Sequence, residues 1–444
     1  MSLYERLRSD WPFAAAKSPF YYGWVIAVVS TFGYLFSIPG QTMGMAVFSD
    51  QFIDAFQLER TTLSIAYLIG TLLSAFLLTR AGRWYDRHGA RLLLITAPML
   101  LAVTLILFSQ VDVVGGWIAR TFDVSVAWIT FPMVLLCYFG VRFSGQGVLT
   151  NASQNLLMLW FEKRRGLVSG VRGVFVSFGF SVAPLLIAGL MLQVGWRGAL
   201  WVMALAVALF AVLAFILVRN APAVIGQQID GRSGTDSGNT ATLTHLSLAQ
   251  ARRTAGFWIY SLALSMHALF GTAVTFHVVA IFAEASRSAD EAFGYFFPQA
   301  VMSVMTNISA SFFADRMKLK PLLVVMLSGF ILGAWGLTQL ESTLGYWALV
   351  IGFGIGGGLW GVLSNLAFVR QFGTRNLGEI TGFNASLTVL ASAIGPAVFS
   401  LARDWMGSFS FAAGVCLGVL VILWCLAVVL KQPRDQLPRL QSHS

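Results

Sequence analysis

Charged residues are scarce in this sequence of 444 residues: they make up 11% of it, whereas hydrophobic residues make up 57%. Soluble globular proteins carry about 25% charged residues, so this chain has too few to cover a surface that faces water. A chain embedded in a bilayer fits instead, because lipid replaces polar solvent. The net charge of +10 therefore has to be sorted by location before it is taken as a sign of nucleic-acid binding.

Cysteine is also rare, and Cys137, Cys416 and Cys425 all lie inside apolar runs. Neither a disulfide framework nor a metal-ligand spacing is present, so we expect packing residues and no metal. The polar N-terminal residues contain no apolar core before a cleavage site, unlike a secretory signal peptide.

Acidic residues are missing from the middle of the apolar runs, because all 19 Asp and Glu residues fall in loops or at run ends. A carboxylate at mid-membrane would be the usual proton carrier or cation site. Its absence disfavours cationic substrates and favours an anionic or neutral one. A proton would then travel on the substrate or on a histidine.

Long apolar runs make up most of the sequence. A helix needs about 20 residues to cross ~30 Å of hydrocarbon, and backbone polar groups in lipid must be satisfied internally. A transmembrane barrel would show short alternating segments instead. We predict an all-α membrane protein of twelve transmembrane helices in two pseudo-symmetric six-helix halves, with spans at 22–48, 60–80, 91–110, 129–159, 166–193, 198–218, 255–283, 292–313, 321–340, 345–371, 378–402 and 409–431.

The longest polar stretch separates the sixth and seventh spans, and its middle is rich in Gly, Ser and Thr, as in flexible linkers. The expected divisions are an N-terminal half, a cytoplasmic linker, a C-terminal half and a cytoplasmic tail: 1–218, 219–254, 255–431 and 432–444. Most of the 29 Lys and Arg residues lie in the termini, the linker and every second loop, which predicts that these face the cytoplasm. This distribution accounts for the net charge without nucleic acid.

The two halves repeat a charged motif after their second span. Residues 81–91 read AGRWYDRHGAR and residues 310–320 read ASFFADRMKLK, so that Asp86 aligns with Asp315 and Arg91 aligns with Lys320. A second repeat aligns three residues with three others, namely Gly166, Gly170 and Pro184 with Gly378, Gly382 and Pro396. Parallel six-span halves are a known transporter plan.

These motifs resemble the major facilitator superfamily over nearly the whole chain. The loop after the second span is similar to the family's signature, and RFSGQG at 142–147 is similar to its second motif. YYGWV in the first span, Phe276–His277 and LGEITG at 377–382 resemble the monocarboxylate and oxalate/formate branch. The eighth span departs from monocarboxylate carriers, because it lacks their Asp and Arg pair.

The aspartates of the repeated motif are expected at the cytoplasmic face, where spans 5 and 11 begin. A helix N-terminus offers unpaired N–H groups and a partial positive charge, so Asp86 would dock near Gly378 and Asp315 near Gly166. The resemblance implies that such contacts form a cytoplasmic gate that stabilises the outward-open state. Gly89 would allow a tight turn, and the arginines would hold Asp86 and anionic headgroups; an ordinary positively charged loop is the alternative. The predicted gate residues are Gly82, Asp86, Arg87, Gly89, Arg91, Asp315 and Arg316.

Arg142 lies inside the fourth span, where a charged residue costs at least ~2.5–3.5 kcal/mol on insertion scales and should face a cavity or a partner. Gln146 and Thr150 follow at helical spacing and would share its face. We interpret Arg142 as a ligand for an anionic substrate, and a structural arginine bound to backbone carbonyls is the alternative. Arg172, near the start of the fifth span, would either face the cavity or snorkel to the cytoplasmic surface.

Other polar residues at mid-span are candidates for binding or coupling. His267 and His277 would exchange protons near neutral pH, or would serve only as hydrogen-bonding spacers. The predicted substrate-binding residues are Arg142, Gln146, Gln41, Tyr34, Asn307, Asn365, Asn384 and His267.

These features predict a secondary transporter in a bacterial inner membrane that moves a small organic anion, a mono- or dicarboxylate, by rocker-switch alternating access. Efflux of amphipathic drugs or other neutral solutes by the same fold is the alternative. A non-transporting sensor would carry an added soluble domain, for which the linker and tail are too short. No nucleophile–base constellation indicates an enzyme, and no cofactor is expected. The expected partners are the substrate, protons and the lipid bilayer, for a monomeric protein.

Overall fold

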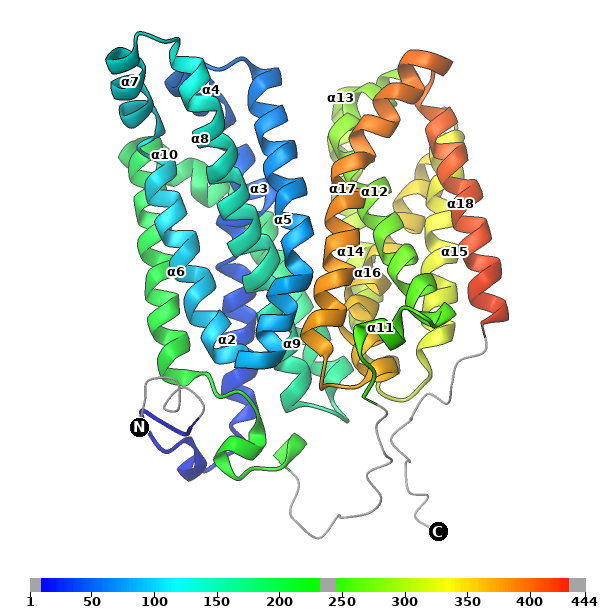
Figure 1. Ribbon diagram of the computed structural model, residues 1–444. Coiled ribbons are helices and arrows are strands. Elements are labelled where there is room, and N and C mark those ends of the chain that lie inside the picture. Colours follow the sequence, from blue (N-terminus) through cyan, green and yellow to red (C-terminus); the bar gives the residue numbers. More distant parts are fainter. Residues whose placement is uncertain (1–8, 232–244, 431–444) are drawn as a thin grey trace. The chain divides into compact units, whose positions relative to one another are not determined.

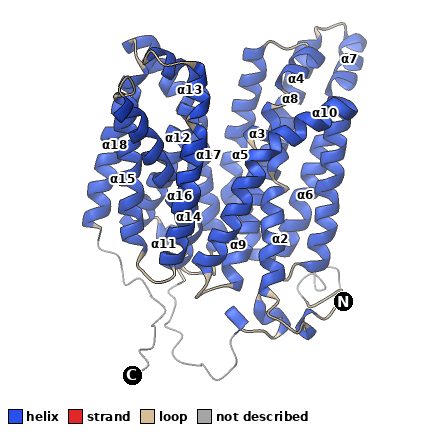
Figure 2. Ribbon diagram, turned by 180° about the vertical axis from the view of Figure 1, so that it is seen from behind, coloured by secondary structure: helices blue, strands red, loops and turns tan. Residues whose placement is uncertain are grey.

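The computed structural model describes residues 9–231 and 245–430, so the middle of the expected linker and the expected tail lie outside the described residues. Within these two ranges, every regular element is helical (Figure 2). The prediction of an all-α fold is therefore confirmed.

The long helices follow the apolar runs (Figure 1). They are α2 (Gly23–Leu35), α5 (Arg60–His88), α6 (Ala90–Phe108), α8 (Val126–Val141), α9 (Thr150–Trp160), α10 (Arg165–Leu217), α12 (Ala255–Glu284), α14 (Phe296–Ala314), α15 (Leu319–Thr338), α16 (Thr343–Phe372), α17 (Leu377–Met406) and α18 (Phe409–Val429). Shorter helices are α3 (Thr42–Ala46), α4 (Ser49–Phe56), α7 (Val111–Phe122), α11 (Leu248–Ala251) and α13 (Ala289–Gly294).

Ten helical stretches of the described residues are long and apolar enough to cross a membrane. α10 contains two expected spans, because its backbone leaves helical geometry at Gly195, where φ is 72°. α14 is not among these ten stretches, although it coincides with the expected eighth span. Counting both arms of α10 and adding α14 accounts for the twelve predicted spans.

Two predicted spans are not continuous α-helices. In the first span, α2 ends at Leu35 and a 3-10 turn at Ile38–Gly40 precedes α3, because Pro39 has no backbone N–H to continue the helix. The fourth span has a π-helical stretch, Arg142–Leu149, between α8 and α9. Such local widening is frequent at functional sites.

The chain forms two compact units. Each unit includes the first turns of a helix whose remainder belongs to the other unit. Thus residues 162–174, with the start of α10, pack in unit 2, and residues 377–386, with the start of α17, pack in unit 1. Unit 1 contains Met1–Phe161, Phe175–Ser237 and Leu377–Ser386, and unit 2 contains Glu162–Val174, Gly238–Asn376 and Leu387–Ser444.

Stacked aromatic rings close one part of unit 1. Phe52 packs on Phe56 and Phe108, with ring centroids 5.0 Å and 4.5 Å apart, and Trp196 lies edge-on at 5.7 Å. Aromatic pairs of this kind contribute ~0.5–1.5 kcal/mol beyond the area they bury. The rings therefore join α4, α6 and the second arm of α10 into one core.

The internal repeat is visible where a basic residue meets the end of a helix. Arg91 Nη2 donates to the carbonyl of Phe215 at 2.6 Å, near the end of α10. Its repeat partner, Lys320, donates to the carbonyls of Val428 and Leu430 at 2.7 and 2.8 Å, at the end of α18. Both cations lie where unpaired carbonyls and a partial negative charge favour them.

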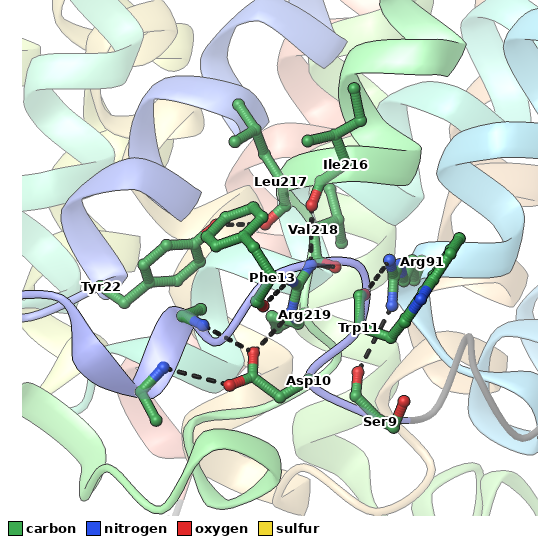
Figure 3. Close-up of polar contacts among 12 residues, drawn as sticks. Ser9, Asp10, Trp11, Phe13, Tyr22, Arg91, Ile216, Leu217, Val218 and Arg219 are labelled. Carbon is green, nitrogen blue, oxygen red and sulfur yellow. Dashed lines mark hydrogen bonds and ion pairs between the residues drawn. The ribbon is translucent and has the colours of Figure 1, made fainter.

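The N-terminal segment of the described chain closes one end of unit 1 around two buried arginines (Figure 3). Arg219 donates to Asp10 Oδ1 at 2.9 Å and to the carbonyl of Phe13 at 2.9 Å. Arg91 is fully buried and donates to the carbonyl of Trp11 at 2.6 Å. The expectation that Arg91 holds lipid headgroups is therefore wrong, because its side chain is fully buried and bonds this segment and α10. That Arg91 also holds Asp86 stays a prediction.

Candidate functional site

Asp86, near the end of α5, accepts hydrogen bonds from two backbone amides of α17. Its Oδ1 lies 2.7 Å from the amide nitrogen of Gly378, and its Oδ2 lies 2.8 Å from that of Glu379. These are the second and third residues of the helix, whose amides a capping side chain normally satisfies. Asp86 therefore caps α17 from another element, and we call this contact the first trans-cap.

Glycines make this close approach possible. A Cβ atom on Gly82 would collide with the carbonyl of Gly378, and one on Gly378 would lie 2.5 Å from the carbonyl oxygen of Gly82. Arg83 Nε lies 3.4 Å from Glu379 Oε1, beside the contact. Gly89 ends α5 with φ at 89°, a conformation that favours glycine. Arg87 is exposed at this end of the helix.

Asp315 forms the second trans-cap, in unit 2. Its carboxylate oxygens lie 2.7 and 2.9 Å from the amide nitrogens of Gly166 and Leu167, the second and third residues of α10. Arg370 Nη2 lies 3.3 Å from Asp315 Oδ1 and adds a charged partner. Arg316 is exposed and lies over the ring of Phe312, 3.7 Å from its centroid. Both aspartates thus lie at the helix starts that the sequence predicts.

Arg142 is 2% exposed at the start of the π-helical stretch. Its Nη1 lies 3.2 Å from the carbonyl oxygen of Gly40 and 3.3 Å from Thr42 Oγ1. Its guanidinium lies over the ring of Tyr67 at 5.2 Å, and the Tyr67 hydroxyl lies 2.7 Å from Thr42 Oγ1. Among the described residues, these contacts include no carboxylate.

The break in the first span brings further polar residues to this point. A Cβ on Gly40 would lie 2.8 Å from the backbone nitrogen of Gln146, so the 3-10 turn packs directly on the π-helical stretch. Gln41 Nε2 lies 3.4 Å from Thr150 Oγ1. Gln146 Oε1 is buried and has no hydrogen-bond partner within residues 9–231 and 245–430. The Arg142 cluster is defined as Gln41, Thr42, Tyr67, Arg142, Gln146 and Thr150.

Unit 2 contains a second polar cluster, at the start of α10. Arg172 is 5% exposed and donates to Asn365 Oδ1 on α16 at 2.5 Å. The expected alternative that Arg172 snorkels to the surface is therefore wrong. Asn307 on α14 donates to the carbonyl of Gly358 at 3.1 Å, and its Oδ1 is buried without a partner in the described part of the chain. Arg172, Asn307 and Asn365 form the Arg172 cluster.

The remaining candidates are divided between the units. Tyr34 packs on Phe180 in unit 1, with ring centroids 5.8 Å apart, and Asn384 lies 9% exposed in the part of α17 that belongs to unit 1. In unit 2, His267 stacks on Phe330 at 5.0 Å, and its Nδ1 has no partner among the residues described. His277 Nε2 lies 3.0 Å from the carbonyl oxygen of Pro396, which suits a hydrogen-bonding spacer.

Three polar contacts beside these candidates have no signal in the sequence. Asn155 donates to Thr381 Oγ1 at 2.8 Å in unit 1, and both residues are buried close to the first trans-cap. Asn376, which precedes α17, donates to the carbonyl of Leu246 at 3.0 Å. Tyr67 contacts Arg142 and Thr42, but in the sequence it is one tyrosine in the apolar run of the second span.

Comparison with known proteins identifies the family of this chain. The family model described as Major Facilitator Superfamily matches residues 30–396. A search of curated proteins finds no significant match.

Solved structures with this fold cover nearly all of the chain. A bacterial homologue of the iron transporter ferroportin, outward-facing with soaked iron, is 14% identical with a TM-score of 0.70 and covers 90% of this chain and 98% of its own. A proton:xylose symporter bound to a glucose analogue is 16% identical with a TM-score of 0.65, covering 91% and 94%. The E. coli fucose:proton symporter is 14% identical with a TM-score of 0.64, covering 93% and 100%. At these identities the likeness concerns the fold alone.

Proposed function

Because the chain belongs to the major facilitator superfamily and is therefore a multi-pass membrane transporter and not an enzyme, we propose that its substrate is a small organic anion, a mono- or dicarboxylate. The observation that supports this proposal is the surroundings of Arg142. Its described contacts are a carbonyl, a hydroxyl and an aromatic ring, so its charge is buried without a counter-ion.

A buried charge without an opposite charge is costly. A carboxylate substrate would offset this cost, since charge-assisted hydrogen bonds to arginine are about twice as strong as neutral ones. Gln41 and Gln146 would supply further donors within the Arg142 cluster. In the Arg172 cluster, Arg172 and the unpaired oxygen of Asn307 are proposed to contact the substrate or its proton.

Tyr34, Asn365 and Asn384 stay secondary binding candidates. For coupling, we favour His267 over His277, since the Nε2 atom of His277 is already beside a carbonyl. The proposed transport is alternating access in a cell membrane, with both termini on the cytoplasmic side. The two trans-caps are proposed to form the cytoplasmic gate and to stabilise the outward-open state.

Counterflow in liposomes tests the substrate proposal. Vesicles with wild-type protein, preloaded with unlabelled formate, lactate, oxalate or succinate, should accumulate the matching labelled anion. Arg142→Gln should lower the affinity for that anion on the order of tenfold to a hundredfold, the effect of removing ~1.5–3 kcal/mol of charged hydrogen bonding. Arg120→Gln is the matched control, because Arg120 is exposed and bonds the carbonyl of Gly116 in its own helix.

The outcome also separates the alternative function. Equal counterflow by the Arg142→Gln variant would remove Arg142 from the substrate site. Movement of neutral amphipathic compounds without any carboxylate would favour the efflux alternative.

A further inference from the structure

The residue that begins α17 does not cap its own helix. Asn376 occupies the N-cap position, with φ at −118° and ψ at 30°, and its side chain makes no capping hydrogen bond. Asparagine is among the best capping residues, so Asn376 could cap α17 but does not. The amides that Asn376 would cap belong to Gly378 and Glu379, and Asp86 occupies both of them.

The side chain of Asn376 is engaged by the end of the linker instead. Its Nδ2 donates to the carbonyl of Leu246 at 3.0 Å, and the amide of Leu246 donates to the carbonyl of Phe372 at 3.1 Å. Ser247 and Gln250 then form a capping box that starts the helical turn α11. Residues 245–251 are therefore docked on the turn that leads into α17.

The second trans-cap has no such competitor. The residue before α10 is Arg164, whose side chain has only donors and has no oxygen to offer to Gly166 or Leu167. Asp315 is also held by Arg370. The two contacts that the repeat makes equivalent thus differ in one respect: the residue before α17 can cap its own helix, and the residue before α10 cannot.

We propose that Asn376 and Leu246 form a cap-exchange switch, an inference that rests on the gate in the proposed function. While Asp86 caps α17, the Asn376 amide holds the linker. When Asp86 leaves, the Asn376 side chain turns to the amides of its own helix, two and three residues ahead, and the carbonyl of Leu246 is released. Docking of residues 245–251 and engagement of Asp86 are then coupled, and each stabilises the other.

The exchange makes departure of Asp86 easier. A cap of this type changes an equilibrium about fivefold, which corresponds to ~1 kcal/mol. The first trans-cap would therefore be released before the second, because Arg164 cannot take the place of Asp315 as a cap.

Two neutral substitutions of Asn376 separate the switch from a merely structural role. Asn376→Ser keeps a capping oxygen but is too short to reach Leu246, so it favours the released state. Asn376→Gln keeps the amide donor but is a poor cap, so it favours the engaged state. In protein whose three cysteines are replaced by serine, Thr381→Cys reports release, because Thr381 is 7% exposed behind the first trans-cap. We expect its maleimide labelling to become about fivefold faster with Asn376→Ser and about fivefold slower with Asn376→Gln.

Hydrogen–deuterium exchange of the full chain provides the second measurement. Asp86→Ala should raise the exchange rate of residues 245–251. In protein that already carries Asn376→Ser, adding Asp86→Ala should raise this rate little further. Either of two results would overturn the switch. One is a Thr381→Cys labelling rate that changes in the same direction in both Asn376 variants. The other is a hydrogen–deuterium exchange rate at residues 245–251 that Asp86→Ala leaves unchanged. If Asp86→Ala also leaves Thr381→Cys labelling unchanged, the gate itself fails, which distinguishes the two proposals.

Discussion

The first trans-cap gives the most direct prediction, because one substitution removes a defined set of hydrogen bonds. Asp86→Asn leaves one oxygen that can accept, while its NH₂ group cannot accept from the second amide. The variant therefore loses one hydrogen bond to a charged group, ~1.5–3 kcal/mol. It also loses the attraction between the carboxylate and the helix N-terminus, ~0.3–1 kcal/mol.

The expected result is a shift toward the state in which the start of α17 has left α5. The loss of the charged hydrogen bond alone corresponds to a change of roughly tenfold to a hundredfold in that equilibrium. Thr381→Cys is again the reporter, because Asn155 covers the Thr381 hydroxyl at 2.8 Å in the capped arrangement. Its labelling rate by a small maleimide should rise by about the same factor.

Asp50→Asn is the control, since Asp50 pairs with Arg60 at an exposed position where both side chains are more than two-thirds exposed. Exposed pairs of this kind contribute only ~0–1 kcal/mol, so labelling should stay near the wild-type rate. An Asp86→Asn variant that labels no faster than Asp50→Asn would refute the reasoning that this carboxylate holds α17.

Two further predictions concern packing and stability. Gly378→Ala should raise the labelling rate of Thr381→Cys, as Asp86→Asn does, because the added Cβ would lie 2.8 Å from Asp86 Oδ1. Gly116→Ala is the control, because a Cβ on Gly116 has no atom within 4 Å and should leave the labelling rate unchanged. Equal labelling rates in the two variants would contradict this reasoning. Asp10→Ala should lower the free energy of unfolding by ~1–3 kcal/mol, because it leaves the buried Arg219 without its ion pair; a thermal-shift midpoint equal to that of Asp50→Ala would show that the pair contributes nothing.

Much of the fold follows from the sequence by local rules. The bilayer thickness sets the length of each apolar run, so the runs predict the helices even where Pro39 or Gly195 breaks them. The repeat identifies Asp86 and Asp315 as equivalent, and the dipole of a helix start indicates what they would meet. The π-helical stretch at Arg142 has no comparable local signal, since its residues fit an ordinary helix equally well.

The candidate site could be predicted only in part, because burial and partners depend on residues far away in the chain. Arg91 belongs to the repeated motif, yet its partners include two carbonyls near the N-terminus and one near the end of α10. Arg172 looked able to reach the surface, but Asn365 on α16 holds it inside unit 2.

The sequence by itself determined the membrane class, the helical spans, the internal repeat and the choice of two aspartates as partners of helix starts, because each depends on composition or on short-range spacing. The tertiary structure decided which amides those aspartates cap. Asp86, for instance, caps the amide of Gly378, which lies 292 residues further along the chain. It also decided that Asn376 holds the linker and not its own helix. Capping within a helix is a local preference, and only packing reveals when a distant carboxylate has replaced the local side chain.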